Sequence, residues 1–197
     1  MRVLEEAREA RVEALEEAKR KREEAREEFK QRLQEIKDQR KAKIVENLDE
    51  RLAERNEKWG NHFNRVLTRL NQIIAKIKVR AEELAGKGVN VSEVNVQIAE
   101  AEAAIAAAQA AVDTQATQVY TIEITDEEGL GDDVSETIGE FKDDIKAVWK
   151  KVRDARQQTV EAFVSLKKAA GETEEDEVSP SPSASPLPTE SPSPTPI

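Results

Sequence analysis

The acidic run 125–133, "TDEEGLGDD", holds the densest group of side chains that could do chemistry. Clustered carboxylates suggest calcium, and an EF-hand loop needs oxygen ligands at positions one, three, five and twelve, with glycine at position six. A loop starting at Asp126 places Gly131 at position six, but Leu130 at position five and Thr137 at position twelve. The calcium pattern fails, and acidic residues before a helix are favoured by its dipole in any case.

A second candidate is the basic run "KRKR", Lys19 to Arg22, which has the composition of a nucleic-acid or nuclear-import patch. Four glutamates flank the run on the same expected helix: Glu16, Glu17, Glu23 and Glu24. Mixed charges at this spacing indicate a salt-bridged, solvated helix face. We therefore predict no nucleic-acid partner.

His62 is the only histidine, and the chain has no cysteine. A zinc site or a Ser/His dyad needs more ligands or partners than this. We expect His62 at the edge of an apolar seam beside Phe63. The aromatic residues Trp59, Trp149, Phe141 and Phe163 are expected to anchor packing, not to stack on bases. Because no glycine-rich phosphate loop is present either, we predict no catalytic, cofactor or metal site and no enzymatic activity.

Composition predicts long helices. Of the 197 residues, 37% are charged and only 4% are aromatic, which is typical of coiled coils. Residues 1–59 carry 17 basic and 17 acidic side chains, and residues 172–197 carry six acidic and no basic ones. This distribution offers no broad basic footprint for nucleic acid or anionic lipid. No apolar run approaches the roughly 18–20 residues of a membrane span.

Residues 1–43 are predicted to form a charged helical arm. Acid-before-base pairs four residues apart, such as Glu16–Arg20, support a helix. The apolar stripe is thin and lapses over 37–43, so we expect the arm to project, either solvated or weakly paired with another chain. It should continue as one helix into the bundle and through Gly60, with a break at Gly60 as the alternative.

Residues 44–171 are predicted to form an antiparallel three-helix coiled-coil bundle, with helices at about 44–85, 92–119 and 133–169. Each helix carries apolar residues at alternating spacings of three and four, the pattern of a heptad seam. The seam of the first helix is Phe63, Leu67, Leu70, Ile74, Ile77, Ala81 and Leu84. The seam of the second is Val94, Ile98, Ala101, Ile105, Ala108, Val112 and Val119. The seam of the third runs from Val134 through Phe141, Ile145 and Val148 to Ala169. We expect an up-down-up topology, with a crossover as the alternative.

The stretch 120–131 is expected to be extended. Tyr120, Ile122 and Ile124 alternate with polar residues, as in a segment that buries one face, and it should lie over the region from Val45 to Leu52. Asp133 with Glu136 resembles a capping box for the next helix, and Ser92 is expected to cap the preceding one.

The C-terminal segment 172–197 begins with "ETEEDE" and contains all seven prolines, alternating with small residues. Such a Ser/Pro sequence favours solvated polyproline II over packed structure. We predict an acidic, then Ser/Pro-rich, disordered tail.

The chain resembles a group of exported helical coiled-coil proteins of unknown function from candidate-phylum bacteria with small genomes. The stretches that carry the resemblance are "EEFKQRLQEIKDQRKAKIVENLDERL", "NRVLTRLNQIIAKI", "AEAAIAAAQAAVDTQA", "VYTIEITDEE" and "FKDDIKAVWKKVRDARQ". The resemblance implies a cell-envelope location and Ser/Pro-rich tails, and it implies no mechanism. Members usually begin with a signal sequence, whereas Met1 here opens directly into the helical pattern, as in a cytosolic protein or one whose signal was removed or lies upstream.

We therefore expect a non-enzymatic structural or interaction protein, a helical spacer of the cell envelope. The alternative is a cytosolic coiled-coil adaptor, and a third class is a peripheral lipid-binding helical protein. Interfacial helices are basic with wide apolar faces, and the narrow seams and the balanced charge of residues 1–59 do not favour membrane binding. The partner is expected to be an unidentified protein, or a second copy bound through the arm.

Overall fold

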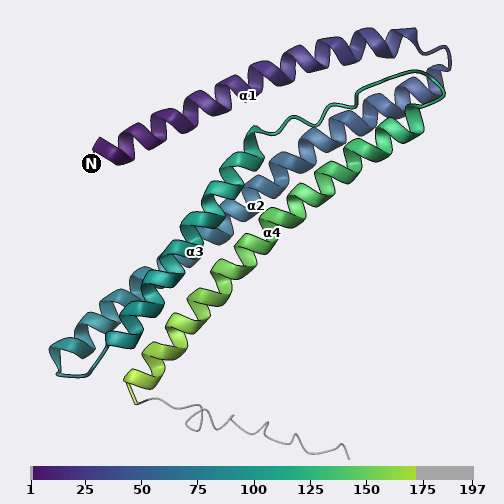
Figure 1. The fold of residues 1–197 in the computed structure, drawn as a ribbon. Coiled ribbons are helices and arrows are strands. Elements are labelled where there is room, and N and C mark those ends of the chain that lie inside the picture. Colours follow the sequence, from purple (N-terminus) through teal and green to yellow (C-terminus); the bar gives the residue numbers. More distant parts are fainter. Residues whose placement is uncertain (1, 172–197) are drawn as a thin grey trace, which may run out of the picture.

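The computed structural model describes residues 2–171, with side chains from residue 9 onward, and contains four helices over that range (Figure 1). They are α1 (Arg2–Glu35), α2 (Gln39–Gly86), α3 (Ser92–Thr117) and α4 (Leu130–Ala169). No strand occurs among the described residues, so the all-helical prediction is confirmed for them. The predicted tail, 172–197, lies outside the described residues.

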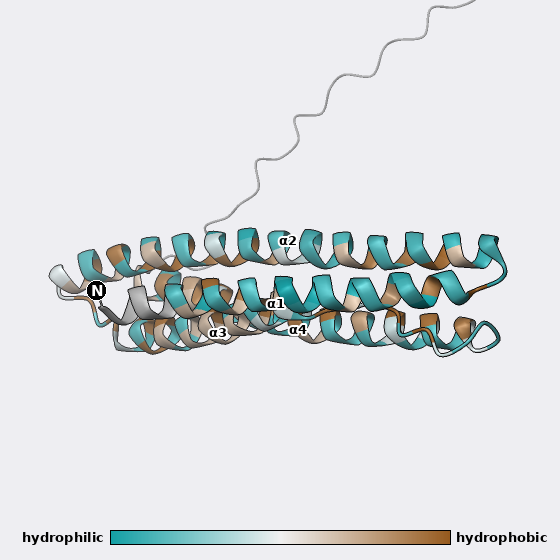
Figure 2. Cartoon of the chain, turned by 90° about the horizontal axis from the view of Figure 1, so that it is seen from above, coloured by the Kyte–Doolittle hydropathy of each residue, from teal (hydrophilic) through white to brown (hydrophobic). Residues whose placement is uncertain are grey.

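Three of the helices, α2, α3 and α4, pack around a common apolar seam. From the short loop after α2 the chain returns along α3, and an extended connection carries it to the end where α4 begins (Figure 1). Hydrophobic residues of α2 face the other helices (Figure 2). All seven predicted seam residues of α2 are buried, as are those of α3 from Val94 to Val112 and those of α4 from Phe141 to Leu166. Each large apolar side chain contributes roughly 1.5–3 kcal/mol when it is buried.

The helix α2 runs unbroken through Gly60, as predicted, over 48 residues. At 1.5 Å per residue its length is about 72 Å. A glycine inside a helix costs roughly 1 kcal/mol relative to alanine, and the buried neighbours Asn56 and Phe63 hold α2 on both sides of it. The molecule is therefore an elongated rod.

The prediction of one continuous helix from the arm into the bundle is wrong. The chain turns at 36–38, and α2 begins at Gln39, five residues before the predicted 44. Asp38 is its N-cap, and one carboxylate oxygen accepts from the N–H groups of Arg40, at 2.9 Å, and Lys41, at 3.3 Å. A side chain that satisfies the free N–H groups of a first turn marks a helix start, here without glycine or proline.

The arm does not project: α1 folds back along the bundle and contacts α2 and α3. Its Phe29 and the following Ile36 are 5% and 7% exposed and belong to the same core cluster as the seam. The reason lies in helix lengths, because α3 has 26 residues and α2 has 48. A stretch of α2 is therefore left without α3, and α1 and the extended connection cover it.

The ends of α3 and α4 also differ from the expected ones. Ser92 is the first helical residue, not the cap, and its N–H donates to Asn90 Oδ1 at 3.0 Å. The helix ends at Thr117, two residues early, and α4 starts at Leu130, three residues early. Ile122, predicted to lie over the first part of α2, is 1% exposed and its N–H donates to Asp49, so this placement of the connection is confirmed.

Truncating Phe29 tests whether α1 is docked. Phe29→Ala should lower the free energy of unfolding of the full chain by about 3 kcal/mol, the usual cost of emptying a buried aromatic site. Val12→Ala is the matched control, because Val12 is an apolar α1 residue that is 54% exposed, and it should change stability by less than about 0.5 kcal/mol. Urea denaturation measures both. Equal, small effects would mean that α1 is not packed on the bundle.

Candidate interaction surface

The acidic run is organised by its own hydrogen bonds. Asp126 Oδ1 accepts from the N–H groups of Glu128, at 2.9 Å, and Gly129, at 2.6 Å. The Asp133 carboxylate accepts from the N–H and the hydroxyl of Thr125, at 2.9 and 3.1 Å. Because α4 starts three residues earlier, Asp133 lies in its first turn and the predicted capping box is wrong. These two carboxylates fix the turn into α4.

Metal ligands are not gathered in the described part of the chain, where no group of three or more His, Cys, Asp or Glu side chains is placed to hold an ion. Glu127 lies elsewhere in the same turn and accepts from the N–H of Lys37 at 3.0 Å. This bond joins the turn before α4 to the turn between α1 and α2. The acidic run thus supplies hydrogen-bond acceptors that tie two connections together.

The basic run at Lys19–Arg22 lies on α1, and one of the predicted mixed-charge pairs forms there. Lys21 Nζ lies 2.8 Å from Glu17 Oε1, and this hydrogen-bonded ammonium lowers the pKa of the Glu17 carboxyl. Lys19, Arg20 and Lys21 are exposed, whereas Arg22 is half-buried. As an exposed contact, this pair contributes little to stability.

His62 is exposed on α2 and packs against aromatic rings. Its ring centroid lies 5.9 Å from those of Trp59 and Phe63, and Trp59 stacks on Phe63 at 5.3 Å. Phe63 is 1% exposed and Trp59 is 39% exposed. The histidine therefore borders the seam as predicted, and the chain has no second imidazole to act with it.

A chain of hydrogen bonds, buried at Asn56 and exposed at Asp144, holds the end of α3 to α2 and α4. Gln115 Nε2 donates to Asn56 Oδ1 at 2.9 Å and to the Tyr120 hydroxyl at 2.8 Å, and Asn56 Nδ2 donates to the Gln115 carbonyl at 3.2 Å. The Tyr120 hydroxyl donates to Asp144, and its ring packs edge-on against Phe141 at 5.1 Å. We call these residues the clasp. Burial and the contact with Asp144 raise the pKa of Tyr120, so it stays a donor at neutral pH.

Asp49 holds the middle of the connection. It is 5% exposed, and its Oδ1 accepts from the N–H of Ile122 at 3.3 Å. Burial raises the pKa of this carboxyl, while the hydrogen bond from Ile122 and the charge of Arg26 act in the opposite direction. The carboxylate is therefore held at a cost in desolvation.

The space beside the clasp suits water more than a substrate. Arg22, Asp49, Asn56 and Tyr120 line a cavity of about 20 Å³, which has room for one water molecule. A wider groove of about 910 Å³ separates α1 from residues 119–125 and includes Phe29 and Ile122. Its charged lining comes from both sides, with Lys21, Glu28, Arg32 and Glu35 on α1 and Glu123 on the connection.

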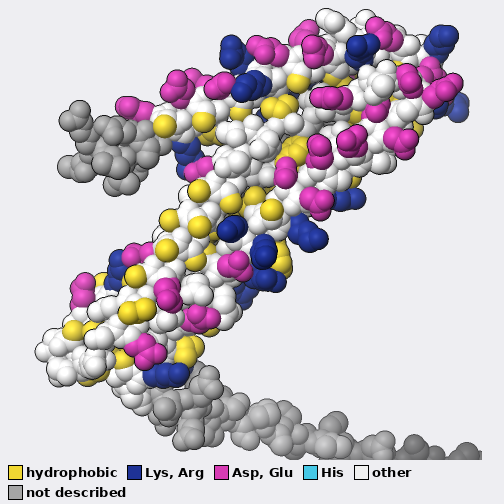
Figure 3. Space-filling model, viewed as in Figure 1, with side chains coloured by type: hydrophobic (Ala, Val, Ile, Leu, Met, Phe, Trp, Pro, Cys, Tyr) yellow, Lys and Arg dark blue, Asp and Glu magenta, His cyan; other side chains and the backbone are white. Residues whose placement is uncertain are grey.

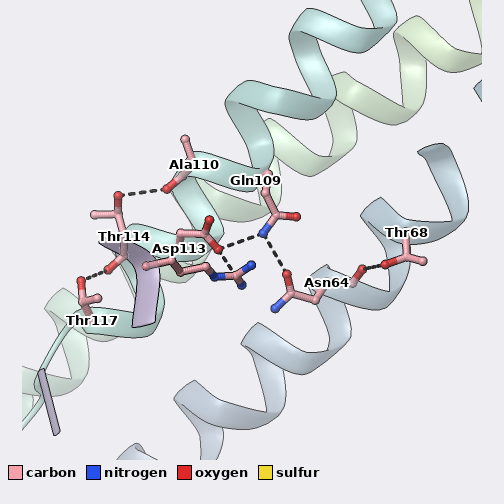
Figure 4. A network of polar contacts seen from close by, with 8 residues as sticks. Asn64, Thr68, Gln109, Ala110, Asp113, Thr114 and Thr117 are labelled. Carbon is pink, nitrogen blue, oxygen red and sulfur yellow. Dashed lines mark hydrogen bonds and ion pairs between the residues drawn. The ribbon is translucent and has the colours of Figure 1, made fainter. Parts of the chain in front are cut away.

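A second polar contact fastens α1 to α3. The side chain of Gln109, on α3, extends toward α2. Its Nε2 donates to Asn64 Oδ1 of α2 at 3.0 Å and to Asp113 Oδ1 of α3 at 2.9 Å (Figure 4). Arg11 of α1 reaches the same Asp113 oxygen at 2.8 Å. The contact extends α1 docking well beyond Phe29. Neither this contact nor the clasp was predictable from the sequence, because single Asn and Gln residues carry no periodic signal.

The aromatic residues do not all anchor packing. Phe141 is 5% exposed, as predicted, but Trp149 and Phe163 are 48% and 45% exposed, so the prediction is wrong for these two. Arg153 lies over the Trp149 ring, 5.3 Å from its centroid, and Lys167 lies over the Phe163 ring at 5.6 Å. Both aromatic residues lie on α4, where Val160 is also exposed. Aromatic and basic side chains therefore lie next to each other on the solvent-exposed side of α4.

No protein-family model, curated protein or solved structure matches the chain. Among the described helices, none is both long and apolar enough to cross a membrane.

Substituting Asp49 tests its role by pH. Asp49→Asn keeps an oxygen for the Ile122 N–H and removes the buried charge, so its melting temperature at pH 7 should exceed that of the wild type. Because the folded pKa is raised, the wild type loses stability relative to this variant as pH rises from the ordinary value of 3.8 through the folded pKa. The gap should therefore close on acidification.

Asp49→Leu is the control for the hydrogen bond. It leaves the Ile122 N–H without an acceptor and should cost about 1–3 kcal/mol. Thermal melts between pH 3.5 and pH 7 compare the three proteins. A gap between the Asp49→Asn variant and the wild type that is independent of pH would contradict a buried, charged Asp49.

Proposed function

We propose that the protein is a non-enzymatic structural or interaction protein that acts as a helical spacer of the cell envelope. The observation that carries the proposal is the use of buried polar groups. The buried Asn56, Gln115 and Asp49 and the half-buried Tyr120 fasten the connection to the bundle, and Asn56, Asp49 and Tyr120 line a cavity with room for one water molecule. These polar side chains stabilise the elongated fold.

The seam supports a rod with coiled-coil packing. Apolar residues repeat at three and four along α2, α3 and α4, and such a repeat favours antiparallel helices that interlock side chains over their full length. A contact face that extends along a rod resists bending better than a compact core does. This property suits a spacer.

Exposed apolar residues favour a second candidate, a cytosolic coiled-coil adaptor. On α1, Val12 and Leu15 are 54% and 39% exposed, and an arm-mediated contact with a partner or a second copy would fall there. Both candidates work through surfaces, with no cofactor, and they differ in location.

Cell fractionation distinguishes the two. An antibody against the folded protein should find it in the envelope fraction of source cells, and externally added protease should remove it from intact cells. A cytosolic enzyme serves as the control and should resist the protease. If the protein stays with that control after fractionation, the envelope spacer is excluded and the adaptor is supported.

A further inference from the structure

A single face of α4 carries a patterned set of exposed residues. From Glu128, just before the helix, to Phe163 they follow spacings of four and three, so they line one side of a helix. In order they are Glu128, Asp132, Ser135, Gly139, Lys142, Lys146, Trp149, Arg153, Arg156, Val160 and Phe163. We call this set the α4 face. All its members are exposed except Gly139, which is half-buried.

The α4 face lies away from α3. Asp144, which reaches the clasp through Tyr120, is on the opposite flank of α4, about 160° from Lys142 at 100° per residue. The side chains along this edge of α4 include basic and hydrophobic ones next to each other (Figure 3). Trp149 is about half exposed, and Lys146 and Arg153 border a surface hollow beside it.

Charge changes sign along the α4 face. Its first part carries Glu128 and Asp132, and its later part carries four basic residues and no acidic one, from Lys142 to Arg156. Asp132, Lys146 and Arg156 form no ion pair with any described residue, and Arg153 has only an exposed contact of 3.9 Å with Asp154. Asp143 also lines the hollow with Lys146 and Arg153, and the dipole of α4 favours the acidic residues at its start. The acidic and the basic parts of one helix face lie too far apart to pair within a molecule, but they are complementary between two molecules.

Residue size changes along the face in the same way. Ser135 and Gly139 are small and belong to the acidic part, whereas Trp149 belongs to the basic part. A Cβ added at Gly139 would meet no atom within 4 Å, and its backbone has no positive φ. Nothing inside the described part of the chain therefore requires glycine there, although it costs roughly 1 kcal/mol in a helix. Close approach of another surface would explain it.

We propose that two copies of the chain pack antiparallel along the α4 face and form a twofold-symmetric dimer. With the axis near Lys142, residues at equal distances before and after it face each other. Asp132 is ten residues before and Arg153 eleven after, and Glu128 and Arg156 are each fourteen away. Ser135 and Trp149 are each seven away, so the indole of one copy meets the small residues of the other.

This antiparallel register satisfies the size pattern and pairs the outer charges, and it brings the two exposed Lys142 side chains together at the axis, where their long side chains have to diverge into solvent. Each acidic residue of the first part faces an arginine of the partner copy, and the contact occurs twice because the interface is isologous. Shifting one helix by two turns would place Trp149 against Lys142 and separate the charge pairs. The dimer is independent of cellular location, so it holds equally for an envelope spacer and for a cytosolic adaptor.

Sedimentation equilibrium of the full chain tests the proposal through a charge swap. The wild type should approach twice the 22.0 kDa chain mass as its concentration rises. Asp132→Arg and Arg153→Asp each place two like-charge contacts in the dimer and should weaken association at least about tenfold. The double variant restores opposite charges and should recover affinity to within about threefold of the wild type.

Lys151→Asp is the matched control, because it makes the same charge change as Arg153→Asp at an exposed α4 position outside the face. It should leave association unchanged. Thermal melts by circular dichroism should show all variants folded, since both swapped residues are exposed.

Four results would overturn the proposal. The first is a wild type that stays monomeric at every concentration, which would leave the face to a different partner. The second is equal weakening by Lys151→Asp and Arg153→Asp, and the third is a double variant that does not recover. The fourth is a dimer that is lost with Val12→Glu but not with either swap, which would assign self-association to the α1 arm.

Discussion

The rest of the fold depends on a mismatch in helix length. Because α3 stops 22 residues short of the length of α2 (48 less 26), about 33 Å of helix surface would lose its cover. An extended connection crosses that gap, and its backbone has no neighbouring strand among the described residues to pair with. Side chains replace the missing strand partner: Asp49 and Asp133 accept hydrogen bonds from backbone N–H groups of the connection, and the clasp holds its first residues. The return of α1 follows from the same mismatch, since Phe29 and Ile36 complete the core there.

Apolar periodicity made the seams predictable. Leu67, Ala101 and Ala155 are all fully buried at positions that a heptad pattern alone selects, and continuity of that phase across Gly60 correctly outweighed its poor helix propensity. Contacts that repeat along a helix produce a periodic pattern of apolar residues in the sequence. This is why the three central helices were recoverable from the sequence, whereas their ends, set by single hydrogen bonds such as that of Asn90, were displaced by a few residues.

The turn at 36–38 and the docking of α1 were not predictable by the same means. Asp38 is an ordinary N-cap residue, but it lies among charged residues with no glycine or proline, so the lapse over 37–43 was interpreted as weak helix. The contacts that hold α1 down are scattered along it, and they include Phe29 and the pairing of Arg26 with Glu50 and of Arg11 with Asp113. Likewise, Trp149 and Phe163 belong to a second face of α4 whose residues are also spaced by three and four. Spacing alone does not distinguish a buried helix face from an exposed one.

The distance along the chain between α1 and its docking surface affects synthesis on the ribosome. The hydrogen bond of Lys37 needs Glu127, which is synthesised 90 residues later, and the ion pair of Arg11 needs Asp113. At about 5–20 residues per second, the nascent α1 spends roughly 5–20 s without its binding site. An apolar segment would need protection by chaperones over that interval. The helix α1, with eleven acidic and ten basic residues and few large apolar ones, exposes little apolar surface during that interval, so the thin stripe that limits its packing also limits its need for such protection.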